Sequence, residues 1–147
     1  MKYSCTTDIE LGIAEVVKLW NDESFFSEWQ DGFQSIELIE GVAGAKGAKS
    51  RLMYSHGKRN LELIETIIKN NLPAEKVALY EHVDMTNIQT SRFEALSEKQ
   101  TRYTSEVEYT KFNGFMPNLM AKLFPGVFKK QSQKWMDQFK AFAENSK

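Results

Sequence analysis

Glu65 and Glu81 are the residues of this 147-residue chain whose types and spacing most clearly suggest chemistry. Each lies in a strand-like run, and a hairpin centred on Pro73 would set them directly opposite each other on one face of a sheet. Two such carboxylates repel and lose hydration, so one of them would keep a proton and share it with the other. The pair could act as a general acid or base, bind a polar group of a ligand, or hold a cation.

A structural pair neutralised by a nearby cation is the alternative. Arg92 is the candidate cation, because one register of the strand from Ile88 to Leu96 turns it inward. The other register turns Gln89, Ser91 and Phe93 inward instead. The sequence leaves both registers open, since a slip of one residue inverts a whole strand.

Histidine and tyrosine side chains supply the other groups of interest. His56 falls beside Tyr54 at the end of a strand, where it could line the mouth of a cavity or be an ordinary hydrogen-bonded residue. Tyr103 and Tyr109 share parity in the last strand and could offer hydroxyl groups to a ligand or pack in the core. Cys5 is expected to be a small buried hydrophobe. The chain has no Cys/His pattern with zinc spacing, so neither a metal nor a cofactor is expected.

Strand parity predicts which residues would face such a cavity. We assume a two-residue turn at Lys58-Arg59 and a hairpin centred on Pro73. One face of the sheet is then mostly apolar and holds Leu52, Tyr54, His56, Leu61, Leu63, Glu65, Ile67, Leu79, Glu81 and Val83. This face is expected to be the concave one. The opposite face, which suits solvent, would hold Arg51, Glu62, Thr66, Tyr80, His82 and Asp84.

The elements that position these residues follow from periodicity. Residues 2–10 alternate like a half-buried strand, and two short helices follow, one over residues 13–20 and one carrying Phe25, Phe26 and Trp29. Further strands are predicted at residues 33–39, 51–56, 61–68, 76–83, 88–96 and 101–112. Short connections favour antiparallel pairing of about seven strands. The predicted class is α+β, with the helices on one face of the sheet.

A long C-terminal helix is predicted from Phe112 to about Glu144. Its apolar face includes four residues expected to line the cavity, namely Met116, Met120, Phe124 and Phe128. Pro125-Gly126 should kink this helix. We expect the part before the kink to flank the cavity entrance, and the part from Val127 onward to pack firmly on the sheet.

Composition bounds the partners. Hydrophobic residues make up 41% of the chain, charged residues 27%, and the formal net charge is −1. Such a balance argues against a broad basic field for nucleic acid or acidic lipid. The first residues lack the apolar core of a signal peptide, and no apolar run approaches the roughly 20 residues that span a bilayer. One cytoplasmic domain over residues 1–147, without stable membrane insertion, is therefore expected.

Several stretches resemble one family. Residues 41–52 resemble the second hairpin of bacterial members of the START-like (SRPBCC) superfamily, residues 61–67 with Leu72-Pro73 their central strands, and residues 115–132 their terminal helix. The superfamily includes polyketide cyclases, Bet v 1-like proteins and lipid-transfer domains. The resemblance implies the helix-grip fold, in which a curved antiparallel sheet grips a long helix over an apolar cavity. It supplies no catalytic residue.

The leading hypothesis is a protein that binds an apolar or amphipathic small molecule, lipid-like or aromatic, between the sheet and the C-terminal helix. The alternatives are a cyclase- or hydratase-like enzyme using Glu65, Glu81 or His56, and a protein-interaction module with a collapsed cavity. A homodimer is compatible with each of these three hypotheses. The candidate cavity-lining residues are Tyr54, His56, Leu63, Glu65, Leu79, Glu81, Arg92, Tyr103, Tyr109, Met116, Met120, Phe124 and Phe128.

Overall fold

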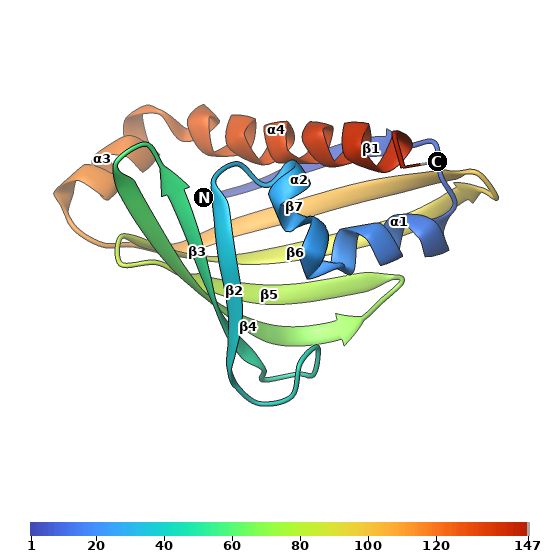
Figure 1. Ribbon diagram of the computed structural model, residues 1–147. Helices are drawn as coiled ribbons and strands as arrows, with labels where there is room; N and C mark the ends of the chain where they lie inside the picture. The colour runs from blue at the N-terminus through green and yellow to red at the C-terminus, as the bar shows by residue number, and fades with distance from the viewer. Residues whose placement is uncertain (147) are drawn as a thin grey trace.

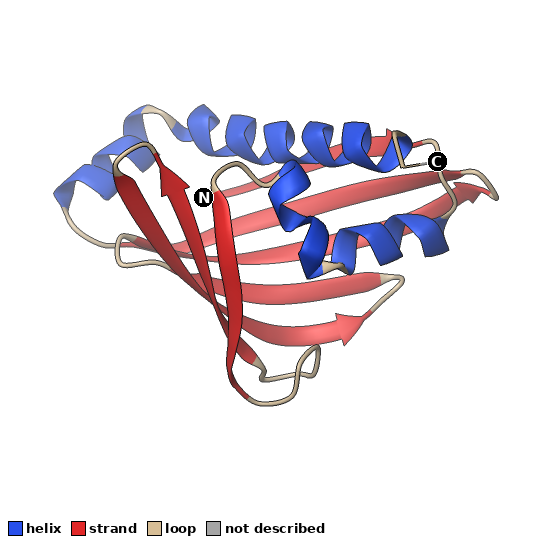
Figure 2. Cartoon of the chain, in the orientation of Figure 1, coloured by secondary structure: helices blue, strands red, loops and turns tan. Residues whose placement is uncertain are grey.

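The computed structural model describes residues 1–146 and contains one sheet with helices on one of its faces (Figures 1 and 2). The strands are β1 (Lys2–Ile9), β2 (Phe33–Glu40), β3 (Lys49–His56), β4 (Arg59–Asn71), β5 (Glu75–Glu81), β6 (Met85–Ser97) and β7 (Gln100–Phe112). The helices are α1 (Ile13–Asn21), the 3-10 turn η1 (Glu23–Phe25), α2 (Phe26–Trp29), α3 (Phe115–Leu123) and α4 (Pro125–Glu144). The predicted α+β class and element order are confirmed.

The seven strands form an antiparallel sheet in the order β1-β7-β6-β5-β4-β3-β2. The chain crosses from one edge strand to the other through α1 and α2, and all later strands pair with their sequence neighbours. Figure 1 shows the sheet curving around α4, which runs along its concave side. This layered arrangement gives the sheet one face covered by helices and one face open to solvent.

In the β3–β4 hairpin the residues lie on the predicted faces, but the pairing register differs from the predicted one. Its turn follows His56, which pairs with Arg59, and Tyr54 faces Leu61 rather than the predicted Leu63. The difference is two residues along the partner strand. Because side chains alternate with a period of two, Tyr54 and the inward residues of β4 remain on the concave face.

The β4–β5 hairpin contradicts the predicted carboxylate pair. Near the turn the pairing is centred on Pro73, as predicted, with Asn71 opposite Glu75. A β-bulge between Ile67 and Lys69 then shifts the register by one residue, so that Glu65 faces Tyr80 and Glu81 faces Ile64. The predicted Glu65–Glu81 pair is therefore wrong. A bulge inverts the faces of one strand relative to its neighbour, which turns Tyr80 inward and Leu79 and Glu81 outward.

Pairing of β6 with β7 decides the register that the sequence left open. Phe93 faces Tyr103 and Ser91 faces Ser105, so Gln89, Ser91 and Phe93 point inward. Arg92 points outward, where it forms ion pairs with Glu75 and Glu106. Arg92 therefore cannot neutralise Glu65 from within the concave face.

The predicted kink at Pro125 is a complete break between two helices that differ in packing. Pro125 is the first residue of α4, a position where its missing N–H removes no helical hydrogen bond. Helix α4 buries Met136, Phe139 and Ala143 against the core, whereas no residue of α3 is buried. The asymmetry between the two parts agrees with the expectation from sequence.

Candidate functional site

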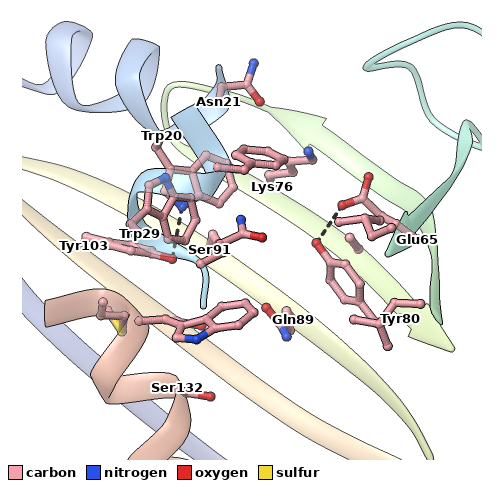
Figure 3. A pocket seen from close by; sticks show the side chains of 18 of the residues that line it. Trp20, Asn21, Trp29, Glu65, Lys76, Tyr80, Gln89, Ser91, Tyr103 and Ser132 are labelled. Carbon is pink, nitrogen blue, oxygen red and sulfur yellow. Dashed lines mark hydrogen bonds between the residues drawn. The ribbon is translucent and has the colours of Figure 1, made fainter. Parts of the chain in front are cut away.

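A pocket of about 130 Å³ lies between the concave face of the sheet and the three helices α1, α2 and α4 (Figure 3). The helical segments contribute Trp20, Asn21, Phe26, Trp29, Gln30, Ser132, Trp135 and Met136. The strands contribute Leu52, Tyr54, Leu63, Glu65, Lys76, Ala78, Tyr80, Gln89, Ser91, Tyr103 and Ser105. The wall is thus a mixture of aromatic rings and polar groups.

A carboxylate forms one side of this pocket. Glu65 on β4 is only 8% exposed, and the Tyr80 hydroxyl on the adjacent strand donates a hydrogen bond of 2.7 Å to its Oε2. Among residues 1–146, Glu65 has no salt bridge and no other hydrogen-bond donor. A carboxylate can accept about four hydrogen bonds, so most of its accepting capacity is unused. A buried acceptor in this state favours a ligand that donates to it.

A second buried hydrogen bond ties the sheet to α2. The Tyr54 hydroxyl donates to Gln30 Oε1 at 2.7 Å, and the Tyr54 ring packs at 5.7 Å from that of Trp135. Gln30 immediately follows the last residue of α2, Trp29. The bond therefore fixes the end of α2 over the pocket and engages the one hydrogen-bond donor of the Tyr54 hydroxyl.

Aromatic rings form the opposite side of the pocket. The indole N–H of Trp20 donates to the Tyr103 hydroxyl at 3.2 Å, and Tyr103 stacks on Phe93 with 4.8 Å between ring centroids. Lys76 Nζ lies 5.7 Å from the Trp20 ring centroid, within cation–π range. Figure 3 shows Trp20, Trp29 and Tyr103 on the side of the pocket away from Glu65 and Tyr80.

Two further indole groups belong to the wall without a hydrogen-bond partner among the described residues. Trp29 Nε1 and Trp135 Nε1 are both buried and unpaired. A buried donor without an acceptor carries a desolvation cost of about 1–3 kcal/mol.

Burial raises the pKa of every tyrosine in the chain. For Tyr80 burial is the largest cause and the negative charge of Glu65 adds to it, and the same two causes act in the same order on Tyr54. Burial is also the largest cause of the raised pKa values of Tyr3, Tyr103 and Tyr109.

Alkaline titration should reveal this burial. We expect the tyrosinate ultraviolet absorbance of the native protein to develop at higher pH than that of the unfolded chain, whose tyrosines ionise near a pKa of about 10. A raised pKa in the folded state gives stability that is complete below pH 10 and is lost as the pH rises through the folded value. The free energy of unfolding, measured in urea, should therefore fall above about pH 10. Superimposable titration curves for native and unfolded protein would contradict the burial of these hydroxyls.

Four of the sequence-predicted site residues line the pocket, namely Tyr54, Leu63, Glu65 and Tyr103. Two others form a separate aromatic cluster. Tyr109 and Phe128 pack together with 5.0 Å between their ring centroids, and both contact the ring of Phe112. This cluster lies between the pocket and α3, so it belongs to the packed part of the α4–sheet contact.

The remaining seven predicted residues lie away from the pocket. Leu79, Glu81 and Arg92 are on the outer face of the sheet, for the register reasons given above. His56 is exposed at the end of β3. Met116, Met120 and Phe124 are exposed because α3 extends past the packed part of α4, so these residues do not flank the pocket as expected. The proposed acid/base set of Glu65, Glu81 and His56 is not assembled.

Sequence reasoning missed most of the helical wall. Trp20 and Trp29 were predicted on the two short helices, but nothing in their spacing indicated that these helices close the pocket. Trp135 was expected only to pack on the sheet. Lys76 and Tyr80 were missed because the bulge in β4 reverses the face of β5. The position of the two short helices could have been predicted, because a chain segment that connects opposite edges of a sheet must cross one of its faces.

Comparisons with known proteins agree on the architecture. No family model matches the chain, and no curated protein matches it. Among solved structures, the Zhui aromatase/cyclase from Streptomyces sp. R1128 superposes with a TM-score of 0.80 at 11% identity, covering 98% of this chain and 93% of that one. A START superfamily protein from Mycobacterium smegmatis gives 0.75 at 12% identity, with 99% of both chains covered.

A third structure, norcoclaurine synthase from Thalictrum flavum in complex with dopamine and hydroxybenzaldehyde, gives a TM-score of 0.70 at 13% identity. It covers 100% of this chain and 88% of that one. At these identities the likeness concerns the fold alone. The sheet order, the gripped α4 helix and these superpositions together show that the protein has the START-like, helix-grip fold.

Proposed function

We propose that the protein binds a small amphipathic molecule, about one aromatic ring in size, in the pocket beside Glu65. The observation that carries this proposal is the combination of aromatic walls with a buried carboxylate that accepts a single hydrogen bond. Aromatic rings favour a flat apolar body, and the carboxylate favours an O–H or N–H donor on the ligand. A protonated amine fits best, because its charge would compensate that of Glu65.

The size of the pocket favours a ring over a lipid chain. Pockets for drug-sized ligands usually measure about 300–1,000 Å³, whereas an apolar cavity of about 150 Å³ accepts benzene. The present pocket, at about 130 Å³, is close to the second value. Dopamine and hydroxybenzaldehyde, which the norcoclaurine synthase structure holds, are of the same class. The acid/base alternative reduces to Glu65 with Tyr80, because Glu81 and His56 lie elsewhere.

A ligand series that varies one substituent tests the proposal. We expect benzylamine and phenol to raise the melting temperature, benzoate to do so least because its charge repels Glu65, and decanoate to do little because of its length. A ligand present at 100 times its Kd should stabilise the protein by about 2.7 kcal/mol. Titration calorimetry then gives the affinities. The proposal would be overturned if neither benzylamine nor phenol stabilised the protein, or if decanoate bound more tightly than both.

Two matched glutamate variants locate the polar contact. Glu65→Gln should weaken benzylamine binding by about 1.5–3 kcal/mol, the range of a hydrogen bond to a charged group, and weaken phenol binding less. Glu81→Gln is the control, since this exposed residue lies on the other face of the sheet. Equal effects of the two substitutions on calorimetric affinity would argue against the Glu65 contact.

A further inference from the structure

A cluster of exposed apolar side chains lies at one end of the molecule, outside the pocket. We call it the apolar tip. Helix α3 buries none of its residues, and Phe115 at its start is 77% exposed. Val83, in the turn between β5 and β6, is 78% exposed. The tip consists of Val83, Phe115, Met116, Met120, Leu123, Phe124 and Val127.

Hydrogen bonds hold the two parts of the tip together. Asn113, in the segment that enters α3, donates from its backbone N–H to the Asp84 carbonyl at 2.7 Å and from Nδ2 to the Val83 carbonyl at 3.1 Å. Figure 1 shows α3 at the end of α4 that is remote from α1. The apolar tip is therefore a formed surface. Helix α3 itself gains little stability from packing, because none of its residues is fully buried.

The charge around the tip is strongly one-sided. Residues 109–133 contain Lys111, Lys122, Lys129 and Lys130 and no acidic residue. All four lysines are exposed, and none forms a salt bridge with any of residues 1–146. Outside this segment the chain has 15 basic and 20 acidic residues, a formal charge of −5 against +4 for the segment. Asp84, which lies beside the tip, is 3.9 Å from His82.

We infer that the apolar tip docks reversibly on an anionic lipid bilayer. Exposed Phe, Leu and Met side chains can enter the boundary between headgroups and acyl chains, and lysines beside them are attracted to anionic headgroups. No helix within the described residues is long and apolar enough to cross a bilayer. The site is separate from the ligand pocket, so this inference does not depend on the proposed function.

Charge also weighs against a second copy of the chain as the partner. A two-fold interface sets the same patch against itself, so the four lysines of one copy would face those of the other with no acidic residue of the segment between them. Like charges facing each other across an interface are unfavourable. An anionic surface removes this repulsion and matches the apolar residues as well.

Vesicle sedimentation tests the inference with the full chain. We expect the protein to sediment with vesicles made of equal parts phosphatidylglycerol and phosphatidylcholine, to do so less in high salt, and to remain free with phosphatidylcholine alone. Failure to sediment with either vesicle would overturn the inference. Binding that is equally strong with both vesicle compositions and insensitive to salt would overturn it as well.

Paired substitutions test the apolar contribution. Phe115→Ser with Phe124→Ser should lower the partition coefficient at least tenfold, since two buried aromatic side chains are lost from the membrane contact. Leu38→Ser with Val42→Ser is the matched control, because these residues are exposed in β2 and the following loop. Equal losses in the two pairs would contradict a role for the tip. Circular dichroism of both double variants checks that the fold is intact.

Lysine substitutions test the electrostatic contribution. Lys122→Gln with Lys129→Gln should lower the partition coefficient about fivefold per lysine. Lys46→Gln with Lys99→Gln, in exposed turns at the opposite end of the sheet, should change it much less. Sedimentation equilibrium without vesicles measures the oligomeric state and so tests a second copy of the chain as the competing partner. The chain could instead be a dimer that the double variant Phe115→Ser with Phe124→Ser converts to a monomer. That result, together with no binding to vesicles, would identify a second copy of the chain as the partner of the tip and overturn the inference.

Discussion

Replacing Phe139 with alanine should lower the free energy of unfolding by about 3–5 kcal/mol, the usual range for a fully buried phenylalanine. The side chain is 0% exposed and lies where α4 meets both the sheet and α2. Its ring centroid is 5.2 Å from that of Trp29 and 6.0 Å from that of Tyr103, so truncation would leave a cavity between three elements. Urea unfolding followed by tryptophan fluorescence measures the loss.

Phe124→Ala is the matched control for this substitution. Phe124 links α3 to α4 and is 56% exposed, and surface substitutions usually change stability by less than about 0.5 kcal/mol. A similar loss for the two variants would mean that α3 packs against the protein in solution. That result would also remove the basis of the apolar tip.

Gly32→Ala should lower the free energy of unfolding by about 2–4 kcal/mol, because it combines a steric conflict with an unfavourable backbone conformation. Gly32 has φ of 75°, and a Cβ atom there would lie 2.3 Å from the Ser55 carbonyl oxygen. The Gly32 carbonyl also accepts a 2.7 Å hydrogen bond from the Ser55 N–H. Since Gln30 and Tyr54 pair beside this contact, the substitution should also weaken ligand binding in the pocket.

Two other glycines separate these causes. Gly57 has φ of 64° with open space around its Cβ position, so Gly57→Ala should show only the conformational cost of about 1–2 kcal/mol. Gly126 lies in the first turn of α4 with open space around it, and Gly126→Ala should stabilise the protein by up to about 1 kcal/mol. If urea unfolding gives Gly32→Ala and Gly57→Ala the same loss, the close approach to Ser55 has no energetic consequence.

Much of the architecture could be read from residue types. The strand alternation, the two short helices and the position of the interruption at Pro125 depend on contacts near in sequence, and these were predicted, although the interruption was expected as a kink in one helix. The parity of Tyr103 and Tyr109 in β7 was right as well, because β7 is regular over that span. Local periodicity also placed Glu65 and Tyr54 on a common face, although the turn between β3 and β4 was misplaced.

The candidate site depended on features that local patterns do not encode. One bulge between Ile67 and Lys69 exchanged Glu81 for Tyr80 as the inward neighbour of Glu65. That exchange converts a supposed pair of carboxylates into a single carboxylate with a tyrosine donor. Bulges carry little sequence signal, and each one reverses the faces of everything beyond it.

The sequence by itself determined the fold class, the order of the elements and the division of the C-terminal segment at Pro125. Only the tertiary structure decided which helices close the pocket, which face β5 and β6 present, and that α3 remains uncovered. The physical reason is the range of the interactions. Periodicity and turn chemistry act over a few residues, whereas strand register and the covering of a helix face depend on partners far away in the chain. The same reason explains the lysines near α3, since a net charge of −1 concealed a basic segment that matters only beside exposed apolar side chains.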